Sequence, residues 1–201
     1  MTALEHLPSG VFERAVERRL DVERKRIDRC YNRTRALFAE ALVAELLPGA
    51  NEEVNPTCAW DVTWKPPDLP TTKIQVKCSG GWIPRFKDRG GQESPPKWEF
   101  RAPRYGFGPD FERLDPGHQC DMFVFARHTG RDIAAGWSFY VLPTTVVVED
   151  GKSTATANQL LAMGAKHCEP RRLAETIRGF LAGPPSVTKV TPDELLGRLR
   201  R

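Results

Sequence analysis

Two short strand-like runs joined by a proline-rich turn constrain this chain more than any other feature. The runs cover residues 60–64 and 73–79. Because strand side chains alternate between two faces, Ile74 and Val76 share one face of the second run, whereas Gln75 and Lys77 share the other. The pattern predicts a sheet with one buried face and one face that presents an amide oxygen beside a cation.

In the first run alternation predicts that Trp60, Val62 and Trp64 share one face, and that Asp61, on the other face, completes the pattern of the second run. If the two runs pair, Asp61, Gln75 and Lys77 converge on one spot. A carboxylate and an amide oxygen suit a hard cation such as magnesium, and an adjacent ammonium suits a phosphate or an attacking water. An exposed strand face that bears Gln and Lys is also ordinary on an antiparallel sheet, so these three residues alone leave both interpretations open.

A helix is predicted over residues 33–47, where Pro48-Gly49 ends it. It is apolar almost all round, which predicts that it is buried against the sheet. Glu40 is the exception, because residues three or four positions away include Leu37 and Val43. A carboxylate in such surroundings is unfavourable unless it is paired or bound to metal.

Further runs give the expected fold class. Apolar runs predict strands at 121–126, at 137–142 and, at an edge, at 145–148. Helical patterns cover residues 10–30, 153–165 and 170–182, and Thr191-Pro192 opens a last short helix. The prediction is an α/β protein with a mixed central sheet flanked by helices and with extra N- and C-terminal helices. The expected units are a helical segment at 1–32, a main domain at 33–182, and a linker with a short helix at 183–201.

Residues 80–118 show few regular signals and carry basic and aromatic side chains together, which suits a surface that follows a nucleic-acid backbone and stacks on bases. The candidate nucleic-acid-binding residues are Arg85, Lys87, Arg89, Lys97, Arg101 and Arg104. Residues 98–101 alternate like a strand, so several of the aromatic side chains are also compatible with a core, and the nucleic-acid interpretation is the preferred one.

Composition agrees with a cytoplasmic protein that contacts nucleic acid. The net charge is +4 and the pI is near 8.9, a mildly basic balance that is compatible with a nucleic-acid partner without requiring one. No apolar run approaches the roughly 20 residues of a membrane span, and no signal peptide is expected at the N-terminus.

The helix with an interior Glu40, followed by Asp61 and by Gln75-Val-Lys77 on successive strands, resembles the PD-(D/E)XK nuclease superfamily. The resemblance covers about residues 33–126. It implies a restriction-endonuclease-like domain at 33–182, in which Asp61, Gln75, Glu40 and the Val76 carbonyl hold Mg²⁺, with Mn²⁺ as a possible substitute. Lys77 takes the place of the family's lysine, and the departure from the pattern is Gln75, which stands where Asp or Glu is usual.

The resemblance implies metal-assisted hydrolysis of phosphodiester bonds, in which Lys77 orients or helps to deprotonate the attacking water. The expected protein is a DNA endonuclease of the type II restriction kind, acting on double-stranded DNA as a homodimer. Two alternatives remain open at this point. One is a catalytically inactive DNA-binding protein of the same fold, in which Gln75 marks the loss of activity. The other is a repair, resolvase-like or defence nuclease.

Overall fold

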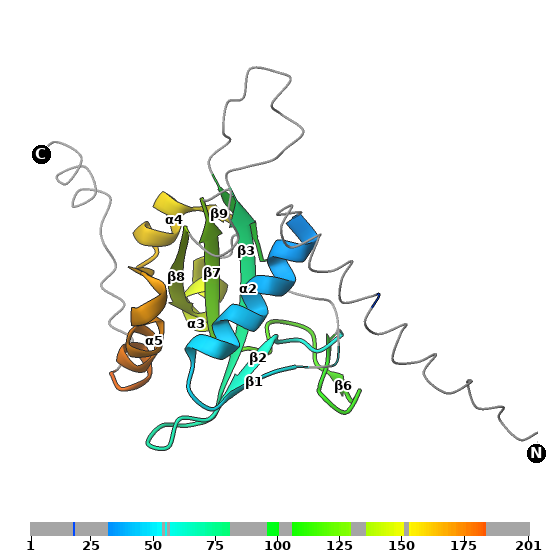
Figure 1. The fold of residues 1–201 in the computed structure, drawn as a ribbon. Coiled ribbons are helices and arrows are strands. Elements are labelled where there is room, and N and C mark those ends of the chain that lie inside the picture. Colours follow the sequence, from blue (N-terminus) through cyan, green and yellow to red (C-terminus); the bar gives the residue numbers. More distant parts are fainter. Residues whose placement is uncertain are drawn as a thin grey trace, which may run out of the picture.

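The computed structural model describes residue 18 and residues 32–53, 55, 57–80, 96–100, 106–129, 136–150 and 153–183, which form a mixed α/β fold (Figure 1). The helices are α2 (Asn32–Leu46), α3 (Thr144–Asp150), α4 (Ala157–Ala162) and α5 (Leu173–Leu181), with a 3₁₀ turn at Pro170–Arg172. The strands are β1 (Ala50–Glu52), β2 (Val62–Trp64), β3 (Thr72–Gly80), β4 (Lys97–Glu99), β5 (Gly106–Phe107), β6 (Arg113–Leu114), β7 (Met122–His128), β8 (Trp137–Pro143), β9 (Thr154–Thr156) and β10 (Lys166–Cys168). The helices predicted at 10–30 and from residue 191 lie outside the described residues.

The central sheet contains six described strands in the order β1-β2-β3-β7-β8-β10. β3 and β7 run parallel, and all the other neighbouring strands of this sheet run antiparallel. The prediction of a mixed central sheet flanked by helices is therefore confirmed. Two small sheets, β4-β9 and β5-β6, accompany it.

One face of the sheet is covered by α2 and α5. Ala39 and Val43 of α2 pack with Ile74 and Val76 of β3 in one buried cluster, which also contains Ile177 of α5. The spacing of four residues between Ala39 and Val43 places both on the same side of the helix. α2 ends as predicted at Pro48-Gly49, where Gly49 takes a positive φ of 78° that glycine adopts without strain.

The opposite face carries an aromatic cluster. Phe123 and Phe125 stack with their ring centroids 5.5 Å apart, and Trp98 of β4 meets Phe125 edge-on at 6.0 Å. α3 and α4 contribute Val147 and Leu160 to the same cluster. The central strand β7 is consequently buried on both faces, which explains its near-continuous apolar sequence.

Two local predictions were wrong. The run at 145–148 is not an edge strand, because Thr144–Asp150 forms α3 and buries Thr144 and Val147, one helical turn apart. The run at 153–165 is not a single helix: it begins as β9, and α4 starts only at Ala157, where Thr156 and Gln159 form a capping box. In both places tertiary packing and capping outweigh the propensity of the local sequence.

We predict that Phe125→Ala lowers the free energy of unfolding by about 3–5 kcal/mol, because it leaves a cavity between Trp98 and Phe100. Phe125 is completely buried. Urea unfolding followed by circular dichroism measures the change. Leu161→Ala on α4 is the control: its side chain is 47% exposed, and its loss changes stability by about 0.5 kcal/mol or less. Equal losses in the free energy of unfolding for the two variants would contradict a closely packed aromatic cluster around Phe125.

Candidate functional site

The candidate site lies at the edge of β3, whose two neighbouring strands, β2 and β7, stop pairing with it at different residues. β2 pairs with β3 from Thr72 only as far as Ile74, whereas β7 follows β3 as far as Gly80. The Asp61 N–H donates to the Ile74 carbonyl at 2.9 Å, at the last point of contact. From Gln75 onward, β2 therefore no longer covers this edge of β3.

The carboxylate of Asp61 lies against the freed edge. The Val76 N–H donates to Asp61 Oδ2 at 2.6 Å, which fixes the side chain beside β3. Since the N–H and C=O of one strand residue point toward the same neighbour, the Val76 carbonyl is directed toward this edge as well. Burial raises the pKa of Asp61, while the Lys77 charge and the Val76 hydrogen bond oppose that rise.

Gln75 and Lys77 lie on the aromatic side of the sheet. The parallel register pairs them with Phe123 and Phe125, and paired residues of neighbouring strands share a face. The predicted alternation along β3 is thus confirmed. The Lys77 ammonium lowers the pKa of both Asp61 and Glu40, so these three charges lie within electrostatic reach of one another.

Glu40 approaches from α2 and is partly buried, as its sequence neighbours indicated. Its pKa is raised to about 7, first by burial and then by the negative charges of Asp61 and Glu52, against a smaller lowering by the Lys77 ammonium. A partly buried carboxyl group whose pKa lies near 7 is typical of functional positions.

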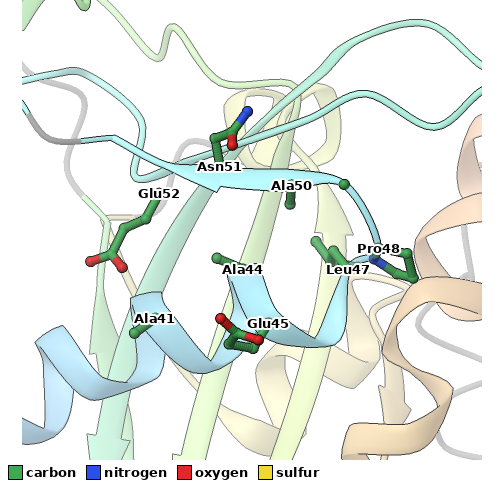
Figure 2. Close-up of a pocket in the computed structure, with 9 residues that line it drawn as sticks. Ala41, Ala44, Glu45, Leu47, Pro48, Ala50, Asn51 and Glu52 are labelled. Atoms are coloured by element: carbon green, nitrogen blue, oxygen red, sulfur yellow. The ribbon is translucent and has the colours of Figure 1, made fainter.

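Glu52 of β1 is a further acid of this neighbourhood that the sequence did not single out. Burial and the charge of Asp61 raise the pKa of Glu52. In Figure 2 the Glu52 side chain extends from β1 toward α2 on the side of Ala41, whereas Asn51 points away from the helix. Glu52 and Ala41 line a pocket of about 430 Å³ between α2 and β1. Glu52 stands in the run Asn51-Glu52-Glu53, and nothing in that polar run distinguishes it from Glu53.

The segment before Asp61 is held by polar contacts on the aromatic side. Trp60 Nε1 donates to Thr63 Oγ1 at 3.0 Å and to Glu53 Oε1 at 3.2 Å, and the Thr63 hydroxyl also donates to Glu53. The Lys73 ammonium lies 4.0 Å from the centre of the Trp60 ring. These contacts position the residue that precedes Asp61.

The sequence pattern was wrong about Trp60 itself. Val62 and Trp64 pack under α2 as expected, but Trp60 packs in the aromatic cluster on the other face. The physical reason is that β2 begins only at Val62, so strict alternation does not reach back to Trp60.

The predicted nucleic-acid-binding residues lie mostly outside the described part of the chain. Lys97 is described: it is exposed on β4, at the edge of the small β4-β9 sheet. The residues that lie outside are Arg85, Lys87, Arg89, Arg101 and Arg104.

The groups that could hold a metal ion at this edge are partly acidic and partly neutral. Within the described ranges, no three His, Cys, Asp or Glu side chains are grouped closely enough to hold a metal ion by themselves. A cation at the edge of β3 therefore requires neutral oxygens beside Asp61, and the Gln75 amide and the Val76 carbonyl are of the type that magnesium accepts. Partly buried acids with raised pKa values fit a cation, because its charge removes their mutual repulsion.

Comparisons with known proteins leave the class of the protein at the level of its fold, a mixed α/β protein. No protein-family model matches the chain, and neither a curated protein nor a solved structure matches it. Among the described helices, none is long and apolar enough to cross a membrane.

We predict that Glu40→Gln stabilises the metal-free protein more at pH 8 than at pH 4.5. The pKa of Glu40 is 4.5 in the unfolded reference and about 7 in the folded protein. Between these values the folded state binds more protons, so the wild-type free energy of unfolding falls as pH rises, and the variant escapes this loss. Urea unfolding in EDTA across this range measures it.

Glu45→Gln is the matched control for this experiment, because Glu45 is exposed on the same helix. It should follow the pH dependence of the wild type. Parallel curves for Glu40→Gln and the wild type would show that Glu40 ionises normally in the folded protein.

Proposed function

We propose that this protein is a magnesium-dependent DNA endonuclease that hydrolyses phosphodiester bonds, built on a restriction-endonuclease-like fold of the PD-(D/E)XK type. One observation carries the proposal: Glu40, Asp61 and Lys77 come from three separate segments and meet at the edge of β3, where the Lys77 ammonium lowers the pKa of both acids and the Val76 N–H holds Asp61. Acids that would hold a divalent cation and a lysine that would face a phosphate are the groups such a reaction needs.

Each residue has a role that follows from its position. Bound Mg²⁺ (or Mn²⁺) would supply charge to the phosphate and acidity to a water, and Asp61, Gln75, Glu40 and the Val76 carbonyl are the groups that would hold it. The Val76 N–H keeps Asp61 Oδ2 in place, which prevents the carboxylate from turning away. Lys77 would bind the attacked phosphate or orient the attacking water.

Cleavage by a type II restriction-type enzyme is the most direct form of this activity. Cutting both strands of a double-stranded DNA at a symmetric site suits a homodimer, because a two-fold axis relates the two active sites as it relates the two strands. A cytoplasmic location and the basic residues of the 82–107 region as the DNA contact belong to the same proposal. A repair, resolvase-like or defence nuclease would use the same site.

A catalytically inactive DNA-binding protein is the second candidate, and one observation favours it. Position 75 carries an amide where a carboxylate would add charge, and the described acids do not form a three-ligand cluster by themselves. Weak metal binding would then leave the fold and the DNA surface intact but remove hydrolysis.

We predict that Lys77→Ala lowers magnesium-dependent cleavage of plasmid DNA by at least about 10²-fold and leaves DNA binding largely unchanged. Cleavage is followed on gels with an EDTA control, and binding by mobility shift in Ca²⁺. Lys65→Ala is the control, since Lys65 is exposed in the turn before β3. It should cut at the wild-type rate.

Two results would contradict the proposal in different ways. Magnesium-dependent cutting that survives both Lys77→Ala and Asp61→Ala would place the activity elsewhere in the protein. Plasmid, duplex and branched DNA that all remain uncut by the wild type, with Mg²⁺ or Mn²⁺, would favour the inactive binding protein.

We predict that Gln75→Glu lowers the Mg²⁺ concentration needed for half-maximal cleavage by about fivefold or more, because the charge count of the ligands sets affinity for hard cations. Titration of cleavage rate against Mg²⁺ measures the shift. Gln159→Glu, on α4 and exposed, is the matched control and should leave the titration unchanged. An unchanged midpoint for Gln75→Glu would remove Gln75 from the ligand set.

A further inference from the structure

A second concave site lies at the end of the sheet where β7 begins. A cavity of about 550 Å³ opens between the start of β7, α3 and the end of α5. This volume is within the range of small-molecule sites in proteins, about 300–1,000 Å³. The Thr144 N–H donates to the Asp121 carbonyl at 3.0 Å, so the first turn of α3 is fixed beside the start of β7.

The lining combines apolar walls with a few polar groups. Met122, Val148 and Phe180 provide apolar surface, and Asp121 and Glu149 provide carboxylates. Val148 is 59% exposed, although it is a large apolar side chain. Asp121 Oδ2 accepts a hydrogen bond from the Lys73 N–H at 2.7 Å, which orients this carboxylate and leaves Oδ1 for a ligand.

His118 connects the cavity with the candidate catalytic site. Its ring meets Phe123 edge-on, with the ring centroids 5.2 Å apart, and Phe123 is the register partner of Gln75. Burial lowers the pKa of His118, and the Lys77 ammonium lowers it further, which favours the neutral imidazole and shows that it lies within electrostatic reach of Lys77. Cys120 also lines the cavity. Burial raises its pKa, and the charges of Lys77 and Asp121 change that pKa in opposite directions.

A neutral imidazole has one donor nitrogen and one acceptor nitrogen. Nδ1 of His118 is buried and has no hydrogen-bond partner among the described residues. The cavity thus offers the His118 imidazole and two carboxylates, those of Asp121 and Glu149, between apolar walls.

We propose that this cavity receives one nucleobase of the DNA substrate, turned out of the helix beside the cleaved phosphate, an inference that rests on the proposed function. Apolar side chains suit the flat faces of a base, and the carboxylates suit the amino groups of adenine, guanine or cytosine. Carboxylates repel phosphates, so the cavity selects a base over the backbone. Lys77, within electrostatic reach of His118, is then placed for the adjoining phosphate.

The test uses 2-aminopurine deoxyribonucleoside 5′-monophosphate as a fluorescent probe, in EDTA. The wild type should bind it saturably below about 1 mM, and an analogue without the amino group should compete less well. Val148→Trp fills the mouth of the cavity and should abolish binding. Glu149→Gln removes a charged acceptor and should weaken binding about tenfold.

Two matched controls lie on exposed surface outside the cavity. Leu161→Trp, on α4, and Glu169→Gln, before the 3₁₀ turn, should bind the probe like the wild type. Because all four substituted side chains are exposed, circular dichroism should show an intact fold for each. Failure of the wild type to bind, or cavity variants that bind like their controls, would overturn the inference.

Cleavage of plasmid DNA by the same preparations separates the two proposals. Cleavage without binding of the probe contradicts the base site but does not contradict the proposed endonuclease activity. Binding that is lost in the cavity variants, in a wild-type protein that cuts no DNA, supports the base site and contradicts the endonuclease. The latter outcome is the one expected of an inactive DNA-binding protein.

Discussion

The unequal pairing of β3 is the constraint on which the candidate site depends. β7 pairs with β3 from Ile74 to Gly80 and β8 pairs with β7, so β3 is firmly placed in the middle of the sheet. β2 leaves β3 after Ile74, and the departing chain brings Asp61 against the Val76 N–H. A longer β2 would have satisfied this edge with backbone hydrogen bonds and left no room for side chains from other elements.

This open edge also explains how residues from opposite layers influence one another. Glu40 belongs to the helix layer, whereas Lys77 projects on the aromatic side of the sheet. A continuous sheet would separate the two charges, yet the Lys77 ammonium lowers the pKa of Glu40. Asp61 stands between the layers and interacts with both residues.

The sequence predicted those parts of this arrangement that depend on periodicity. The alternation along β3 and the apolar central strand follow from spacing and are present in the structure, and the predicted helix packs on the sheet with Glu40 partly buried, although it buries one face only and leaves Leu37 exposed. Periodicity could not predict β1, a polar strand of three residues held by its pairing with β2. Glu52 was missed for this reason. His118 was missed as a neighbour of Lys77 because only tertiary packing on Phe123 brings it close.

Glu52, which the sequence did not predict, and the predicted acids Glu40 and Asp61 together change the interpretation of Gln75. With an amide at this position, Glu40 and Asp61 are the two acids of the ligand set that the resemblance implies. Glu52 interacts with both Glu40 and Asp61, and so restores a third negative charge to the same neighbourhood from a different strand. A fourth acid at position 75 would add repulsion at Glu40, whose pKa burial, together with the charges of Asp61 and Glu52, already raises to about 7. The neutral side chain at Gln75 is therefore compatible with a charged site, because the charge is supplied from β1.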